Sequence, residues 1–279
     1  MLLTVNIGNF NMLLAVYQNN KMLFRSQLRT DPMKTADEYA IQLKNVLSLY
    51  GVSCEDLTGA IISCVAPALT SSLKDAILLL HKVRILTVGP GLKTGLNIKI
   101  DNPAQLGADL VACAAAVRAK FPAPNVVINF DTAISAMGID KDGAVIGCCI
   151  SPGIRLSLEA LTTHAAQLPQ IDLEHIPTTI AGTNTVASME AGLILGNACM
   201  LDGLIERFAA LLGAEPTVVA TGDFSRQIAS QCRHEIICEP NLICDGLAAL
   251  YRRNTKSVYP LLCQRPAYHG AFHPGGHCP

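Results

Sequence analysis

One acidic side chain stands where a carboxylate could act as a base. Asp109 follows Gly107 and Ala108 and opens an apolar, alanine-rich segment that continues to Ala119. This pattern predicts a helix with Asp109 in its first turn, where the helix dipole stabilises a negative charge. Because carboxylates are common at that position for this reason alone, the spacing leaves two roles open for Asp109: a helix cap or a site residue.

Two further stretches join an apolar run to a polar turn and then to a second apolar run, which is typical of β-hairpins. Their polar turn residues could face a ligand; they are Asn6, Gly8 and Asn9 in the first stretch and Asn129, Asp131 and Thr132 in the second. A third apolar run, Val218 to Ala220, ends in a turn at Gly222 and Asp223. Asn6 and Asn129 occupy equivalent places about 120 residues apart, so the sequence predicts a duplicated domain with a cleft between its halves.

The elements that must position these turns repeat in the same order. Each half begins with three strand patterns and continues with alternating helix and strand patterns. This order predicts an α/β fold, the duplicated ribonuclease-H-like fold of actin and the sugar kinases, with a central interdomain cleft. We expect one half at residues 1–120, the other at 121–254, and an irregular tail at 255–279.

Composition excludes several classes of partner. A formal net charge of -1 gives no reason to expect a nucleic acid. Every apolar run is broken before the roughly 18 residues that a membrane span needs, so we expect no membrane partner. No secretory signal is visible, which predicts a cytoplasmic location. The eleven cysteines include no CxxC pair and are expected to be reduced, small, buried hydrophobic residues.

Ordered motifs along nearly the whole chain make the sequence similar to the type III pantothenate kinases. They are Asn6-Ile7-Gly8-Asn9, Arg29-Thr30-Asp31-Pro32, Thr35-Ala36-Asp37-Glu38-Tyr39, Gly89-Pro90-Gly91-Leu92-Lys93-Thr94-Gly95, Asp101-Asn102-Pro103, Gly107-Ala108-Asp109, Ser151-Pro152-Gly153, Asn184-Thr185, Ala220-Thr221-Gly222 and Tyr251-Arg252-Arg253-Asn254. The resemblance implies phosphorylation of pantothenate by ATP, the first step of coenzyme A biosynthesis. It also implies Mg²⁺, a monovalent cation (K⁺ or NH₄⁺), and a dimer whose pantothenate pocket uses both subunits.

The resemblance assigns roles to single positions. Asp109 matches the family's proton acceptor. The positions that match the ATP and phosphate turns are Asn6, Gly8, Asn9, Thr132 and Gly222. Those that match the pantothenate pocket are Gly107, Ala108, Leu110 and Thr185, and Asn129 matches the monovalent-cation position.

Several of these positions depart from the family pattern. The family has Asp where this chain has Asn6 and Asn129, so two cations lose a charged ligand. It has Gly at Asp131 and at Asp223, where this chain places a negative side chain beside phosphate. It has Arg at Leu110, so the substrate carboxylate loses its partner. Such losses predict weak activity.

Two functional classes therefore stay open. The chain is either a kinase, weak alone or completed by a partner subunit, or a catalytically silent, regulatory or ligand-sensing paralogue. A dimer, homodimer or heterodimer with an intact paralogue, is expected through the helix pattern from Val186 to Leu212, although its apolar stripe also fits an internal core. In the tail, His269, His273 and His277 fit either a metal site or an irregular end.

Overall fold

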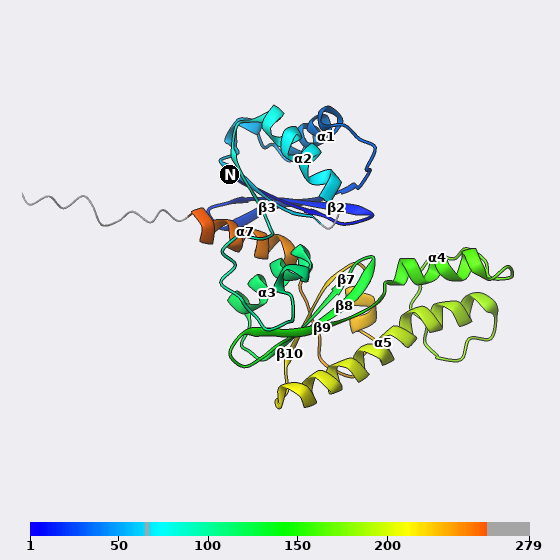
Figure 1. The fold of residues 1–279 in the computed structure, drawn as a ribbon. Helices are drawn as coiled ribbons and strands as arrows, with labels where there is room; N and C mark the ends of the chain where they lie inside the picture. The colour runs from blue at the N-terminus through cyan, green and yellow to red at the C-terminus, as the bar shows by residue number, and fades with distance from the viewer. Residues whose placement is uncertain (65–66, 256–279) are drawn as a thin grey trace, which may run out of the picture.

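The computed structural model describes residues 1–64 and 67–255 of the 279-residue chain. These residues form two β-sheets with helices between them and on their outer faces (Figure 1). The predicted irregular tail, with His269, His273 and His277, lies outside the described residues.

The first sheet consists of a three-stranded meander extended by two parallel strands. Its spatial order is β3 (Lys21–Arg29), β2 (Asn11–Gln18), β1 (Leu2–Ile7), β4 (Gly59–Cys64) and β5 (Arg84–Thr87). β1 pairs antiparallel with β2 and parallel with β4. The successive residues Leu3, Thr4 and Val5 are all buried, as expected for a central strand covered on both faces.

The second sheet repeats this topology. Its spatial order is β11 (Ile237–Cys238), β10 (Thr217–Gly222), β7 (Asn125–Phe130), β8 (Ala133–Ile139), β9 (Ala144–Pro152) and β6 (Asn97–Ile98). β7 pairs antiparallel with β8 and parallel with β10, as β1 does with β2 and β4. The repetition confirms the predicted duplicated ribonuclease-H-like fold. The short strand β6 pairs with β9 although it precedes residue 120; the division of the chain at residues 120 and 121 stays a prediction.

Four helices cover the first sheet and the space between the sheets. They are α1 (Ala36–Leu49), α2 (Pro67–Leu80), α3 (Ala108–Lys120) and α7 (Leu242–Thr255), with single turns η1 (Cys54–Asp56) and η2 (Pro103–Gln105). α1 and α2 lie on the outer face, whereas α3 and α7 lie between the sheets (Figure 1). Gly246 allows α7 to approach α3 closely, because a Cβ there would collide with the Ala112 carbonyl.

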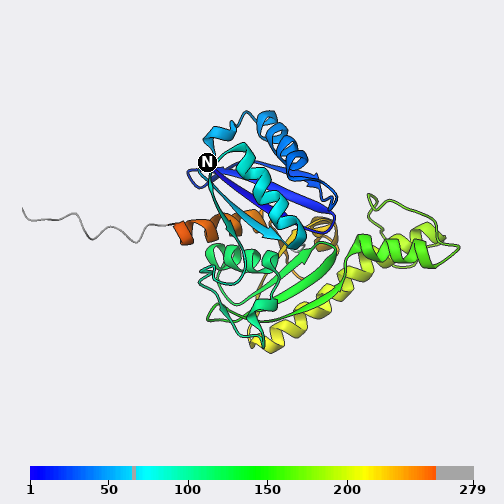
Figure 2. The ribbon, with the colours of Figure 1, turned by 45° about the horizontal axis from the view of Figure 1, so that its top comes forward.

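Three helices accompany the second sheet: α4 (Ile154–His164), α5 (Thr185–Leu212) and α6 (Ser225–Ala229). α4 and the beginning of α5 project away from the body of the molecule (Figure 2). Among the described residues, α5 alone is long and apolar enough to cross a membrane by length and composition. Its Leu201 and Ile205 are fully buried in the core of the second half, which is typical of a core helix.

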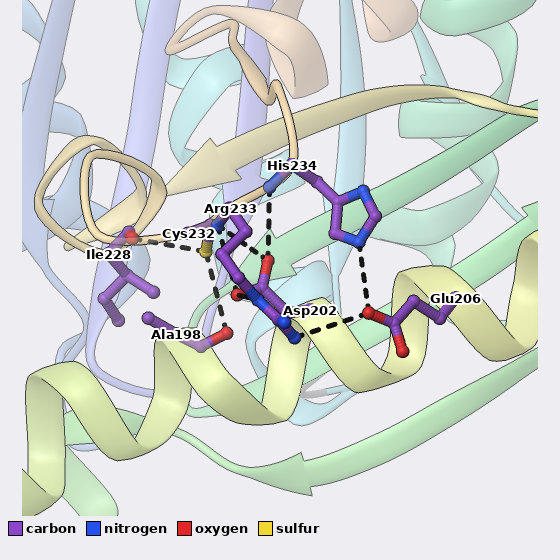
Figure 3. Close-up of polar contacts among 7 residues, drawn as sticks. All are labelled: Ala198, Asp202, Glu206, Ile228, Cys232, Arg233 and His234. Carbon is purple, nitrogen blue, oxygen red and sulfur yellow. Dashed lines mark hydrogen bonds and ion pairs between the residues drawn. The ribbon is translucent and has the colours of Figure 1, made fainter.

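A buried carboxylate joins α5 to the segment that precedes β11 (Figure 3). Asp202 is 3% exposed and accepts hydrogen bonds from the backbone amides of Arg233, at 3.0 Å, and His234, at 3.3 Å. The Arg233 side chain also pairs with Asp202 and with the exposed Glu206. These bonds satisfy a charge that would otherwise be costly to bury, and they fix this segment on α5.

The described cysteines form no disulfide, but not all of them are buried. Cys113 and Cys244 are buried as expected, whereas Cys148, Cys149 and Cys199 are exposed. The prediction of burial was wrong for these three. Cys148 and Cys149 point to opposite faces of β9 and both are exposed, so neither face of the strand is covered there.

Candidate active site

The hairpin turns of the two halves meet at one cleft. Asn9, between β1 and β2, donates from Nδ2 to the Thr132 hydroxyl between β7 and β8, at 3.3 Å. A Cβ added at Gly8 would lie 3.0 Å from the Asp131 carboxylate. The duplication therefore brings Gly8, Asn9 and Thr132 together, as the sequence predicts.

The third turn lies beside the second. β7 and β10 are parallel and in register at their last residues, Phe130 and Gly222. Gly222 has φ +91°, and a Cβ there would collide with the Phe130 carbonyl oxygen. Only glycine fits readily at residue 222. Because β7 and β10 are parallel and end in register, Asp131 and Asp223 leave the two neighbouring strands at the same end of the sheet.

Asp109 stands in the first turn of α3 and faces the second half. Its Oδ2 accepts a 2.9 Å hydrogen bond from Asn129 Nδ2. Desolvation raises the pKa of the partly buried Asp109, and the backbone amides of Leu110 and Asp109 together with the Asn129 amide oppose that rise. A carboxylate with a raised pKa is a stronger base than an exposed one.

The cleft contains an excess of negative charge. Asp131 is solvent-exposed but lies in a concave site, where desolvation raises its pKa; the Thr132 amide lowers it, and the charges of Asp109 and Asp223 raise it further. Arg155 lies 3.6 Å from Asp223 and 5.2 Å from the centre of the Phe224 ring. In contrast, no positively charged side chain among the described residues lowers the pKa of Asp131.

Two buried amides in the strands leave an oxygen without a partner. Asn6 is 6% exposed and Asn129 is 2% exposed, and within residues 1–64 and 67–255 neither Oδ1 accepts a hydrogen bond. A buried polar atom without a partner is uncommon. Amide and carboxylate oxygens are hard donors of the kind that Mg²⁺ and K⁺ accept. Among the described residues, however, no group of three or more acidic, histidine or cysteine side chains is placed to hold a metal ion.

A larger cavity, of about 660 Å³, adjoins the start of α3. Its lining includes Gly89, Pro90, Gly91, Thr94, Gly107 and Ala108. Leu110, the third residue of α3, is 5% exposed and packs in the hydrophobic core between the sheets. The glycine turn and the Gly107-Ala108 pair therefore share one cavity, and Leu110 is not among the residues that line it.

Thr185 lies apart from these residues. It is exposed at the beginning of α5, in the part that projects from the body (Figure 2). A single chain therefore does not bring Thr185 to Gly107 and Ala108.

The sequence interpretation did not single out Arg155, although a signal for it exists. Arg155 follows Ser151-Pro152-Gly153, and a Cβ at Gly153 would collide with the carbonyls of Asp131 and Thr132. This close contact fixes the start of α4 beside the second turn, so the second residue of α4 reaches the cleft.

Two similar sheets around a cleft with three convergent turns define the actin and sugar-kinase fold superfamily. A protein from Sinorhizobium meliloti described as a 2-dehydro-3-deoxygalactonokinase has this fold, with a TM-score of 0.57 and 12% identity over 92% of this chain and all of that one. The sequence model named Type III pantothenate kinase matches residues 2–207. The type III pantothenate kinases of Listeria monocytogenes serotype 4a and Bacillus cytotoxicus are each 37% identical over 254 residues, 91% of this chain and 98% and 97% of theirs. This chain belongs to the type III pantothenate kinase family.

Proposed function

We propose that the chain transfers the γ-phosphoryl group of ATP to pantothenate, with Asp109 as the proton acceptor. The observation that carries this proposal is the position of Asp109. Its carboxylate accepts a hydrogen bond from Asn129 of the second half, and its neighbours Gly107 and Ala108 line the large cavity. Asp109 therefore lies between the turns that would hold phosphate and that cavity. The pantothenate hydroxyl oxygen forms a bond to the γ-phosphorus, the bond to the bridging oxygen of ADP breaks, and the hydroxyl proton passes to Asp109.

The remaining turn residues hold and orient the phosphates. Gly8, Asn9, Thr132 and Gly222 offer backbone amides and small polar groups, the donors that suit phosphate oxygens. A divalent cation supplies charge neutralisation on the transferring phosphoryl group. Asn6 and Asn129 offer neutral oxygens, Asn129 at the proposed K⁺ or NH₄⁺ position, whereas Asp131 and Asp223 offer charged ones.

We expect the isolated chain to be a slow kinase. Leu110 is buried in the core and has no charge to pair with the pantothenate carboxylate. Asn6 and Asn129 carry no charge for a cation, and the exposed Asp131 carboxylate repels phosphate at Gly8. Loss of one electrostatic donor at a catalytic site costs about 10² to 10³ in rate, so several losses together leave little activity.

A second subunit is part of the proposal because Thr185 is far from the cavity within one chain. The projecting part of α4 and α5 exposes Leu156, Leu161, Ile180 and Val186, an apolar surface suited to a partner. Met189 and Leu193 of the predicted stripe are buried within the subunit, whereas Gly192 and Cys199 are exposed. The partner is a second copy or an intact paralogue, and a monomeric mass at all micromolar concentrations would contradict a homodimer.

The alternative is a catalytically silent, regulatory or ligand-sensing paralogue, favoured by the neutral amides at Asn6 and Asn129, where the family pattern has carboxylates. One assay separates the two functions: purified chain with ATP, Mg²⁺, K⁺ and pantothenate, with Asp109→Asn as the control. Slow phosphopantothenate formation that Asp109→Asn abolishes supports the kinase. Heat of binding for ATP or pantothenate without turnover supports the silent paralogue, and turnover that survives Asp109→Asn contradicts the assigned role of Asp109.

A further inference from the structure

The cavity of about 660 Å³ beside the start of α3 is lined by uncharged residues. In the described part of the chain, no lysine, arginine, histidine, aspartate or glutamate belongs to this lining. Most of the surface comes from glycines and from apolar side chains such as Val88, Leu92 and Val111, while Thr94 and Gln105 supply a hydroxyl and an amide. Such a lining suits a ligand that is neutral where it contacts the protein, because an ion loses its hydration there without gaining a partner.

The cations that are close to this lining in the sequence belong to other surfaces. Lys93 precedes the lining residue Thr94, but it is exposed and stands outside the lining. The backbone amide and carbonyl of Lys93 both bond to the Asn254 side chain, which fixes this turn on α7. Arg118 and Arg253 line a second cavity, of about 270 Å³, which shares only Thr94 with the first. None of the three cations is therefore placed to pair with an acid in the larger cavity.

The charged group beside the larger cavity is negative. Asp109 directly follows Ala108 of the lining, and the next residue, Leu110, is buried in the core. If the pantothenate hydroxyl lies at Asp109, the carboxylate at the other end of the molecule extends along the uncharged lining. That carboxylate is desolvated without a cation and is repelled by Asp109, whereas a neutral amide in its place avoids both costs.

The two polar side chains of the lining match an amide. Thr94 Oγ1 accepts a 3.2 Å hydrogen bond from the Leu96 amide, so its own proton can be donated to a ligand oxygen. Gln105 is exposed at the end of the single turn η2, which the Asn102 side chain caps through the Ala104 amide at 3.1 Å. The side chain of Gln105 both donates and accepts, and an amide ligand does the same, whereas a carboxylate only accepts.

We propose that this cavity accepts neutral amides of pantothenic acid in preference to pantothenate. This specificity rests on the proposed kinase function, which places the reacting hydroxyl at Asp109. The hydroxyl oxygen bonds to the γ-phosphorus, the bond to the bridging oxygen of ADP breaks, and the proton passes to Asp109, while the amide is unchanged. The cavity volume is within the range of about 300 to 1,000 Å³ that is usual for small organic ligands, which leaves room for a substituent on the amide nitrogen.

The test is calorimetric titration of the full chain, without nucleotide, with pantothenate and with its primary amide, pantothenamide. We expect the amide to bind about tenfold more tightly or better, because only the acid loses a charge from water. Gln105→Arg places a cation in the lining and should reverse this preference, with pantothenate binding that weakens as salt is added. Gln105→Glu should weaken pantothenate binding further and change amide binding little.

Gln18→Arg is the matched control, because Gln18 is exposed at the end of β2 and lies outside the lining. It adds the same charge to the chain and should keep the wild-type preference. Thermal unfolding of each variant shows that it is folded. Three results would overturn the proposal: wild-type chain that binds pantothenate as tightly as the amide, wild-type chain that binds neither compound, or Gln18→Arg that shifts the preference as much as Gln105→Arg does.

Phosphorylation of both compounds by ATP, measured separately, distinguishes this inference from the proposed function. If the amide binds more tightly and neither compound is phosphorylated, the selectivity of the cavity is supported and the kinase function is contradicted. If pantothenate is both bound and phosphorylated in preference to the amide, the kinase function is supported and the selectivity is contradicted.

Discussion

The substitution Asn129→Asp tests how much stability the protein loses when a second carboxylate is placed beside Asp109. In the structure the Asn129 amide donates to Asp109 at 2.9 Å, and both groups are shielded from solvent to a large degree. An aspartate at residue 129 replaces this donor with a second acceptor. Two carboxylates would then face each other unless a proton or a cation lies between them.

Two contributions and one upper limit determine the expected decrease in the free energy of unfolding. The lost hydrogen bond to a charged acceptor is worth about 1.5 to 3 kcal/mol. Repulsion of two charges at roughly 4 Å adds about 4 kcal/mol at an effective dielectric constant of 20. Protonation of one carboxyl at neutral pH limits the total to about 4 kcal/mol and restores one hydrogen bond. We therefore expect about 3 kcal/mol of destabilisation, or a melting temperature about 6 °C lower for a chain of this size.

The assay is thermal unfolding at neutral pH and constant ionic strength, in choline chloride and then in KCl or MgCl₂. We expect the cations to restore most of the lost stability, because they neutralise the new pair. Asn125→Asp is the matched control: Asn125 lies on the same strand, is 1% exposed, and donates to the Pro122 carbonyl instead of a carboxylate. The reasoning is refuted if Asn129→Asp melts as the wild type does, or if the cations rescue both variants equally.

Four further outcomes are expected. Asp109→Asn should lower any pantothenate kinase activity by about 10²-fold or more while leaving circular dichroism unchanged. Burial raises the pKa of Asp109, so between its pKa in the unfolded chain and its higher pKa in the native state the folded protein keeps a proton that the unfolded chain releases. Wild-type stability should therefore fall as the pH rises between these two pKa values. Urea unfolding of Asp109→Asn at several pH values should lack this decrease. Asp202→Ala should lose about 3 kcal/mol in urea unfolding, because two backbone amides lose their acceptor, whereas Glu206→Ala, at an exposed pair, should change stability by less than about 1 kcal/mol. Gly222→Ala should reduce stability by about 2 kcal/mol or more, measured in the same way, because its φ is positive and the Phe130 carbonyl leaves no room.

Local patterns carried most of the information about the fold. A capping box at Thr35 and Glu38 begins α1, and its three-residue spacing is visible in the sequence. The polar turns begin after Ile7 and Phe130, so Asn6 and Asn129, which were expected in the turns, lie inside β1 and β7 because the ladder with the next strand continues past them. The capping box and the hairpins themselves depend on residues close together in the chain, so the sequence displays them directly.

The sequence by itself determined the duplicated topology, the family and the position of Asp109 at the start of a helix, because each depends on periodicity, turn chemistry or an ordered set of motifs. Only the tertiary structure decided that Asn129 donates to Asp109, that Leu110 is buried in the core, and that Asp131 and Asp223 lie side by side. The pairing of β7 with β10 joins segments separated by the whole of α4 and α5. No local pattern specifies which distant strand lies beside which, so contacts across the cleft emerge only when the sheets and helices pack.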